Sequence, residues 1–461
     1  MEELSLDLVI LGGGPGAYNA AFRAADLGRK VTIIEERENL GGICLNVGCI
    51  PSKTLLHAAE MIYSRKEAQE YGITASDYKL DLDQLRKKKV EIIGNLIKGL
   101  NFLAKKRKVD VIRGYGTFAD DSTIHVTGGD GEKKVSFKHC IIAAGSRPVI
   151  FSSLPADDER LWVSTDALEL THVPKKLMVL GGGIVGLEMA TIYNALGSDV
   201  TVVEMLDQIL PMTDKDVARV VEKRLKKQGV TIKTKTKLES IQPKDDGLLA
   251  TYDGEDVLYD IILVSVGRRP NGDMIGLENT SIEHDDKGFI GVDETMKTSV
   301  DSVFAVGDIV GQPMLAHKAS HEGIVAAEVA CGRKSAFVAR TVPSVVYTIP
   351  EAAWTGLSEK DAEKEGIRFT RGKFPYSANG RAMVHNATDG FVKILFEEES
   401  HRVIGAAMVG PHAGDMISEL TLALEMGADM EDIGKTIHPH PTLAETIGFA
   451  AEVAAGTAVE I

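Results

Sequence analysis

Two of the four cysteines, Cys44 and Cys49, stand five residues apart with a glycine, Gly48, just before the second. Two thiols at this spacing can close a disulfide and open it again. A helix is predicted to begin near Pro51, and a thiol at a helix N-terminus has a lowered pKa and is more often a reactive thiolate. The alternative is two unlinked buried cysteines, which is a common state of free cysteine. We favour a redox dithiol, because a predicted nucleotide site lies close by in the sequence.

A second candidate for chemistry is His440, which stands between two prolines in the run His438-Pro439-His440-Pro441. The prolines restrict the backbone and so fix where the imidazole points. Glu445 could orient the ring through a ring N–H, as a carboxylate orients a catalytic histidine. Two histidines of a surface loop are the alternative, but a cycling dithiol needs a general acid/base. No metal site is predicted, since His438 and His440 have no third ligand nearby in the sequence.

One pattern occurs twice in the chain: an apolar run, a glycine turn, a helical stretch and a second apolar run that ends in glutamate. The turn residues and the closing glutamate are Gly12, Gly14, Ala17 and Glu35 in the first copy, and Gly181, Gly183, Gly186 and Glu204 in the second. The first glycine and the glutamate are 23 residues apart in both copies (35 − 12 and 204 − 181). Each copy is therefore predicted to be a strand, a tight turn, a helix and a second strand.

Both copies are typical of a dinucleotide-binding unit. The first glycine allows the tight turn, the second lets backbone approach a pyrophosphate, and the third small residue keeps the helix close to the strand. Phosphates would lie on the helix N-terminus and the glutamate would bind ribose hydroxyls. An ordinary glycine turn would not explain the same spacing twice, so two dinucleotides are predicted. In the second unit, Glu204 and Asp207 would repel a 2′-phosphate, which favours NAD over NADP.

Composition limits the class of protein. The 461 residues suggest about three domains, and four cysteines do not make a disulfide-dense secreted protein. The net charge of −15 disfavours nucleic acid as a partner and allows a partner with a basic patch. No apolar run is long enough to span a membrane, and the acidic start, Met1-Glu2-Glu3, is unlike a signal peptide. We therefore expect a cytoplasmic enzyme.

Other segments predict the elements that position these residues. A lysine-rich helix is expected over 81–108, and a segment with glycine turns precedes a strand that begins at Cys140. A buried strand over 304–306 leads into Gly307 and Asp308. From Arg340 onward the pattern changes to an α+β module, with strands over 390–396 and 403–409 and an apolar helix over 416–426.

These motifs make the chain resemble the flavin-dependent pyridine nucleotide-disulfide oxidoreductases. The resemblance covers essentially the whole chain and rests on the two glycine fingerprints, 42–53, 305–308, 314–318 and 438–442. The cysteine and histidine motifs are highly specific, whereas glycine fingerprints alone are not. More narrowly, the motifs resemble the family members that reoxidise dihydrolipoyl groups in 2-oxoacid dehydrogenase complexes.

The resemblance implies an α/β fold with two Rossmann-like dinucleotide-binding domains and a C-terminal α+β dimerisation domain. The expected boundaries are 1–150 for the FAD-binding domain, 151–272 for the NAD-binding domain, 273–340 for a central segment that completes the FAD site, and 341–461 for the interface domain. It also implies a homodimer. The implied partners are the lipoyl domains and the acyltransferase core of 2-oxoacid dehydrogenase complexes.

The resemblance further implies a role for each motif residue. The residues expected to bind FAD or NAD are Gly12, Gly14, Ala17, Glu35, Lys53, Gly116, Asp308, Met314, Leu315, Ala316, His317, Gly181, Gly183, Gly186, Glu204 and Gly267. The residues expected to be catalytic are Cys44, Cys49, Lys53, Glu188, His440 and Glu445. Cys49 would be the thiolate next to the flavin, and Cys44 would exchange disulfide with the substrate. Lys53 would pair with Glu188 near the flavin. His440, assisted by Glu445, would come from the other subunit.

The implied reaction begins when His440 deprotonates dihydrolipoamide, which attacks the Cys44 sulfur of the disulfide. Lipoamide leaves, the dithiol reduces the flavin through Cys49, and NAD takes the hydride. Glutathione reductase is an alternative that would need cations where Glu204 stands. Mercuric reductase is another, but it uses a C-terminal cysteine pair, and no cysteine follows Cys331. A non-catalytic flavin- and NAD-binding sensor would not need the dithiol and the histidine together.

Overall fold

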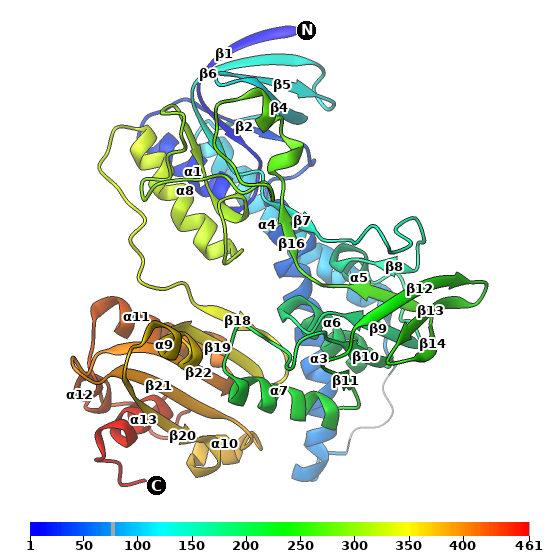
Figure 1. Cartoon of the computed structure of the whole chain (residues 1–461), viewed down its shortest axis with the longest axis vertical. Coiled ribbons are helices and arrows are strands. Elements are labelled where there is room, and N and C mark those ends of the chain that lie inside the picture. Colours follow the sequence, from blue (N-terminus) through cyan, green and yellow to red (C-terminus); the bar gives the residue numbers. More distant parts are fainter. Residues whose placement is uncertain (75–78, 461) are drawn as a thin grey trace. The chain divides into compact units, whose positions relative to one another are not determined.

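The computed structural model describes residues 1–74 and 79–460 of the chain. They form two compact units (Figure 1). Unit 1 comprises Met1–Thr54, Asp81–Val149 and Gly267–Val338. Unit 2 comprises Leu55–Leu80, Ile150–Val266 and Ala339–Ile461. Because each unit is assembled from three stretches of chain, residues far apart in the sequence meet within it.

Unit 1 is built on a seven-stranded sheet in which β3-β2-β1-β6 and β17 are parallel, while β5 and β4 extend it antiparallel. The strands are β1 (Glu2–Leu11), β2 (Val31–Glu35), β3 (Asp110–Arg113), β4 (Tyr115–Asp120), β5 (Thr123–Thr127), β6 (Lys133–Ile142) and β17 (Val303–Ala305). A separate antiparallel pair joins β7 (Ser146–Pro148) to β16 (Arg268–Pro270). The apolar ends of β1, β2 and β6 are buried, as expected of parallel strands covered on both faces.

The helices of unit 1 are α1 (Pro15–Asp26), α2 (Gly42–Val47), α4 (Leu82–Lys106) and α8 (Ala316–Ala330). A short 3-10 turn, η4 (Gly307–Ile309), follows β17. Helix α3 (Cys49–Ala68) begins in unit 1 and continues into unit 2. Helices α1 and α8 pack at two glycines, because a Cβ on Gly323 would lie 2.3 Å from the carbonyl oxygen of Gly16.

Unit 2 contains a second parallel sheet, with strand order β11-β10-β9-β15-β8. Its strands are β8 (Leu161–Trp162), β9 (Lys176–Leu180), β10 (Asp199–Val203), β11 (Thr231–Lys233) and β15 (Ile261–Val264), and its helices are α5 (Ser164–Glu169), α6 (Ile184–Leu196) and α7 (Lys215–Lys227). An antiparallel sheet of β12 (Leu238–Lys244), β13 (Gly247–Tyr252) and β14 (Glu255–Tyr259) lies between β11 and β15 in the sequence.

The C-terminal part of unit 2, yellow to red in Figure 1, is an antiparallel sheet with order β18-β19-β22-β21-β20. Its strands are β18 (Ser344–Val346), β19 (Glu351–Gly356), β20 (Phe369–Pro375), β21 (Phe391–Glu397) and β22 (Val403–Gly410). Its helices are α9 (Glu359–Glu365), α10 (Gly380–Val384), α11 (Ala413–Met426), α12 (Met430–Gly434) and α13 (Glu445–Ala455). Helix α13 packs on β20 and β21, and α11 packs on β19 and β22.

The predicted fold class is confirmed: two parallel sheets of the dinucleotide-binding type and a C-terminal α+β region are present. The helix predicted over 81–108 is α4, and its start is fixed by Asp81, whose side chain accepts a hydrogen bond from the Gln84 N–H (2.9 Å). Strand β1 begins earlier than the apolar run at Leu8, because Glu2 to Leu6 pair with Lys133 to Phe137. None of the helices in the described ranges has the length and apolar character needed to cross a membrane.

The close contact between α1 and α8 predicts that a larger residue at Gly323 destabilises the folded protein. Replacing Gly323 by Ala should destabilise the protein by about 1–3 kcal/mol, because the new methyl group overpacks against backbone. Gly94, in α4, is the control, since a Cβ there would meet no atom within 4 Å and Gly94→Ala should be neutral or stabilising by about 0.5–1 kcal/mol. Thermal unfolding of both variants tests this, and equal shifts in Tm would contradict it.

Candidate functional site

The two glycine turns have the same backbone geometry. Gly12 has φ 109° and Gly181 has φ 108°, both in the left-handed region that favours glycine. A Cβ on either would lie 2.3 Å from a carbonyl oxygen, that of Ala143 or that of Ser265. Each turn leads directly into a helix, α1 or α6, that has no side-chain cap on its first N–H groups. These N–H groups can therefore bind an anion.

The glutamate of each copy lies beside its own glycine turn. Glu35 accepts hydrogen bonds from the N–H groups of Arg37 (2.8 Å) and Gly13, and Glu204 accepts them from Gly182 (2.7 Å) and Leu206 (2.8 Å). Both side chains are buried. Burial raises the pKa of Glu35, and the two N–H donors oppose that rise. Each carboxylate oxygen keeps a lone pair that can accept a ribose hydroxyl.

Asp207 is placed differently from Glu204. It is exposed and pairs with Lys215 (Nζ to Oδ2, 3.0 Å), which lowers the pKa of Asp207. Its charge is thus largely compensated by a lysine. Discrimination against a 2′-phosphate stays a prediction, and Glu204 is the acid of the two that lies beside the glycine turn.

The structural repeat extends beyond the sequence pattern, into the loop that follows each glutamate. In the first copy the N–H of Gly41 donates to the carbonyl of Gly13 (2.8 Å), and in the second the N–H of Leu210 donates to that of Gly182 (2.9 Å). Both donors stand six residues after the glutamate (41 − 35 and 210 − 204), and both have positive φ, 117° and 48°. The equivalence was missed in the sequence because the two residue types differ.

The dithiol lies where the first of these loops ends. Cys44 is in α2 and Cys49 is the first residue of α3, two residues before the predicted helix start. Their two side chains are hydrogen-bonded to each other. That bond and burial raise the pKa of Cys44, while the charge of Lys53 opposes the rise. Unit 1 therefore brings Cys44, Cys49 and Lys53 together.

Helix α1 runs beside this cysteine pair. The pKa of Tyr18 is raised by burial and by the nearby Cys44 and Cys49. The N-terminus of α1, which is the predicted pyrophosphate position, is thus close to the thiols. The first residues of the redox segment also touch the glycine turn, since a Cβ on Gly42 would lie 2.6 Å from the Cα of Gly14.

Asp308 is held in its turn by residues that sequence reasoning missed. The N–H of Gly307 donates to Glu322 Oε2 (2.7 Å), and Glu322 Oε1 pairs with Lys318 (2.8 Å). The carboxylate and the ammonium are both buried on α8. Asp308 itself accepts a hydrogen bond from the hydroxyl of Ser146. The only signal in the sequence was the four-residue spacing of Lys318 and Glu322 on one helix face.

Arg268 completes the network around Asp308. Its Nε donates to the Ser146 hydroxyl (2.7 Å) and lies 4.0 Å from the Asp308 carboxylate. Burial lowers the pKa of Arg268, and the charges of Asp308 and Cys49 oppose this. The guanidinium of Arg268 is therefore close to the predicted ribityl-binding acid and is also within the electrostatic influence of Cys49. Arg268 was not among the predicted site residues.

The remaining predicted flavin residues also lie in unit 1. Residues 314–317 lie at the start of α8, with Leu315 as its N-cap. Gly116, in β4, is explained by packing, because a Cβ there would lie 2.7 Å from Leu11 Cδ1. Gly267, which the sequence groups with the second nucleotide unit, has φ 125° and belongs to unit 1, where its carbonyl accepts from the Val149 N–H (3.1 Å).

In unit 2, His440 and Glu445 form the predicted pair. Nδ1 of His440 lies 2.8 Å from Glu445 Oε1, and the other carboxylate oxygen accepts from the Thr442 N–H (2.7 Å). The carboxylate is mostly buried, whereas the imidazole is 80% exposed. With Nδ1 bound to the carboxylate, Nε2 is the nitrogen left to accept a proton from a substrate.

His438 has its own carboxylate. Its Nε2 lies 2.8 Å from Glu419 Oε1, and its ring is only 8% exposed. The bond to Glu419 raises the pKa of His438, against the effect of burial. The two histidines are therefore oriented by different glutamates. No group of side chains suited to a metal ion occurs among the described residues.

Two predicted pairings join residues of different units. Glu188 is buried in α6, where its Oε1 accepts from the Tyr347 N–H (3.1 Å), and its predicted partner Lys53 belongs to unit 1. Likewise, all four cysteines belong to unit 1 and His440 to unit 2. The pairing of Lys53 with Glu188 and the meeting of His440 with the dithiol stay predictions.

Comparison with known proteins identifies relatives over the whole chain. Dihydrolipoyl dehydrogenases from Vibrio cholerae and Geobacillus stearothermophilus are 49% and 44% identical, over 100% and 99% of this chain and 98% of each relative. Among solved structures, LpdA from Mycobacterium tuberculosis matches with a TM-score of 0.90 and 29% identity, over 97% of this chain and 99% of the other. The flavoprotein disulfide reductase RclA from Escherichia coli matches with 0.87 and 25%, over 97% and 99%.

Two family descriptions also match. Residues 6–323 match pyridine nucleotide-disulphide oxidoreductase, and residues 342–451 match the dimerisation domain of that family. These ranges include both glycine turns, the dithiol and the His440–Glu445 pair. The chain belongs to the pyridine nucleotide-disulphide oxidoreductase family.

Proposed function

We propose that the chain is an enzyme that oxidises protein-bound dihydrolipoyl groups to lipoyl groups and passes the electrons through FAD to NAD. The observation that carries this proposal is the hydrogen-bonded pair of Cys44 and Cys49 beside the α1 turn, in a chain that also holds the His440–Glu445 pair. The dihydrolipoyl dehydrogenases that are 40–49% identical over nearly the whole chain favour this substrate over glutathione disulfide or mercuric ion.

Unit 1 fits FAD. The turn at Gly12 leaves no space for a Cβ, the uncapped start of α1 presents N–H groups to a pyrophosphate, and the buried Glu35 lies beside them for the ribose. Asp308, in the network of Ser146 and Arg268, would hold the ribityl chain. When bound, FAD supplies the two-electron chemistry that links a dithiol to NAD.

Unit 2 repeats that geometry for NAD. Gly181 and Gly183 form the turn, Gly186 lies in the first turn of α6, and Glu204 would bind the ribose hydroxyls. We assign NAD rather than NADP, because a buried carboxylate at this position would repel a 2′-phosphate.

Proton transfer in the proposed reaction involves His440 and Cys44. His440 Nε2 takes a proton from a substrate thiol, and the resulting thiolate attacks the sulfur of Cys44 in the oxidised pair. The Cys44–Cys49 bond breaks, and its electron pair leaves on Cys49 at the start of α3. The second substrate sulfur then displaces Cys44 and closes the lipoyl disulfide. Cys44 takes the first proton back from His440, and His440 takes the proton of the second substrate thiol. The raised pKa of Cys44 suits its reprotonation.

We propose a homodimer in which each His440 serves the partner's dithiol. The match of 342–451 to a dimerisation domain supports this. The boundaries given above for four domains are part of the same proposal. Lipoyl domains and the acyltransferase core of a 2-oxoacid dehydrogenase complex are the proposed partners. A dithiol that must cycle fits a reducing compartment, the cytoplasm.

The reaction itself is the first test. Purified protein should carry a flavin spectrum and reduce NAD with dihydrolipoamide as donor. NADP should support much slower turnover, because of Glu204. Reduction of glutathione disulfide or mercuric ion by NADPH at a comparable rate would contradict the proposal.

The shared site makes a prediction about mixed dimers. Cys44→Ser and His440→Ala should each abolish or greatly slow turnover, and both should keep FAD. Co-expression of the two variants should restore activity, because one site of the mixed dimer then has intact cysteines from one subunit and His440 from the other. Cys331→Ser, at a half-buried cysteine away from the dithiol, is the control and should stay active. An inactive mixed dimer would place His440 in the same subunit as its dithiol.

The Asp308 turn makes a prediction about FAD retention. Glu322→Gln leaves Lys318 buried without its charge partner and loosens the bond to Gly307. FAD should bind about tenfold more weakly, since a disturbed buried hydrogen bond costs roughly 1–3 kcal/mol. Glu328→Gln is the matched control on the same helix, where the carboxylate pairs with a half-exposed Arg23. Release of fluorescent free flavin on dilution measures the difference, and equal release from both variants would refute the assignment.

A further inference from the structure

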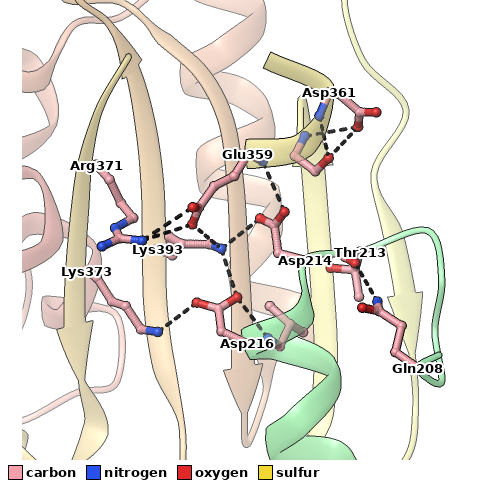
Figure 2. Close-up of polar contacts among 11 residues, drawn as sticks. Gln208, Thr213, Asp214, Asp216, Glu359, Asp361, Arg371, Lys373 and Lys393 are labelled. Carbon is pink, nitrogen blue, oxygen red and sulfur yellow. Dashed lines mark hydrogen bonds and ion pairs between the residues drawn. The ribbon is translucent and has the colours of Figure 1, made fainter. Parts of the chain in front are cut away.

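A lysine of the C-terminal sheet is buried among three carboxylates. Lys393, in β21, is 1% exposed, and its ammonium pairs with Asp214 (2.7 Å), Asp216 (2.9 Å) and Glu359 (2.7 Å), as Figure 2 shows. Two outer cations balance the remaining charge: Lys373 pairs with Asp216 (2.7 Å) and Arg371 with Glu359 (3.3 Å). A lysine is almost never fully buried unless it is paired in this way. The burial of Lys393 therefore indicates a structural role for its ammonium group.

The three carboxylates belong to two helix starts. Asp214 directly precedes α7 and Asp216 lies in its first turn, while Glu359 is the first residue of α9. Asp214 uses its second oxygen to accept from the Glu359 N–H (3.0 Å). Lys393 thus fastens the beginning of α7, a helix of the NAD-type sheet, to β21 of the C-terminal sheet. Both sheets belong to unit 2.

The segment that ends at Asp214 begins at Glu204, beside the glycine turn. It runs over 204–214, from the ribose-binding Glu204 to the start of α7. Leu210 in its middle donates its N–H to the carbonyl of Gly182. The side chain of Gln208 donates to the carbonyls of Leu210 (3.3 Å) and Thr213 (3.0 Å). Hydrogen bonds therefore connect the glycine turn to the residue that precedes Asp214.

The backbone conformation of Leu210 also depends on its surroundings. Its φ of 48° lies in the left-handed region, which is strained for a residue with a side chain, and its side chain is fully buried. A residue in such a conformation persists only when its surroundings enforce it. In the first copy the equivalent position is Gly41, which adopts positive φ without strain and leads straight into α2. The second copy has a leucine at this position and a longer loop. The conformation of this loop therefore depends on the contacts of Asp214 with Lys393 and Glu359.

We propose that Lys393 is a positioning residue for the NAD site: it fixes the start of α7 and thereby holds the 204–214 loop against the glycine turn. This rests on the assignment of NAD to Gly181–Glu204 made above. Without the ammonium, three partly buried carboxylates repel one another and the start of α7 moves away from β21. Leu210 then relaxes, and Gly182 and Glu204 lose the geometry that binds the nucleotide.

The test separates NAD binding from the flavin reaction in the holoenzyme. In Lys393→Met, the KM and the Kd for NAD should rise about tenfold, as expected when binding groups are displaced by a fraction of an ångström to an ångström. Anaerobic reduction of the bound flavin by dihydrolipoamide needs no NAD and should keep its rate. Lys393→Arg should restore most of the NAD affinity. Lys223→Met is the matched control, since Lys223 is an exposed lysine of α7 that pairs with Asp389 (2.9 Å).

If Lys393→Met does not fold, a milder variant tests the same inference. Asp216→Asn leaves Lys393 with two carboxylates and should raise the KM for NAD in the same direction by a smaller factor. Unchanged NAD affinity in both variants would overturn the inference, as would equal losses in NAD binding and in flavin reduction. A wild-type enzyme whose flavin is reduced by dihydrolipoamide but which does not bind NAD would contradict the proposed function instead, and the inference with it.

Discussion

The close approach of each glycine turn to a neighbouring strand end is the constraint on which both nucleotide sites depend. Gly12 lies against the carbonyl oxygen of Ala143, just after β6, and Gly181 lies against that of Ser265, just after β15. A Cβ on either glycine would lie only 2.3 Å from that oxygen, so no other residue fits there. That approach sets where α1 and α6 begin and where their N–H groups point. It also sets the place of the dithiol, because Gly42 starts α2 against Gly14. The redox centre is therefore positioned by the nucleotide turn rather than by a separate framework.

The two copies share this turn and diverge directly after it. In the first copy, Gly41 bonds back to the turn and the chain enters the short helix that carries Cys44. In the second, Leu210 makes the same bond, but the chain continues to Asp214 and α7. The short connection after the first turn places a cysteine beside that turn. The longer connection after the second turn ends at Asp214, which pairs with Lys393 of β21. One duplicated unit can thus serve two different cofactors.

The sequence was sufficient for features that depend on local patterns. The glycine spacing, the lysine-rich helix over 81–108 and the strand runs over 390–396 and 403–409 each reflect patterns of residues close in the chain. The bond of Ser146 to Asp308 joins residues 162 positions apart, and that of Lys393 to Asp214 joins residues 179 apart. Nothing in the local sequence marks Lys393 as buried, because a charged residue in a strand ordinarily faces solvent. Such residues become recognisable only when the fold brings their partners together.

The same distinction between local and long-range effects explains the asymmetry of the two cysteines. In the sequence they are equivalent thiols, and only a helix start distinguishes Cys49. In the fold, burial and the bond between the thiols disfavour a negative charge on Cys44. Attack on Cys44 places the charge on Cys49, whereas attack on Cys49 would expel Cys44 as the disfavoured anion. In the proposed reaction, attack on Cys44 is therefore favoured, because it leaves the charge on Cys49, the more exposed of the two sulfurs.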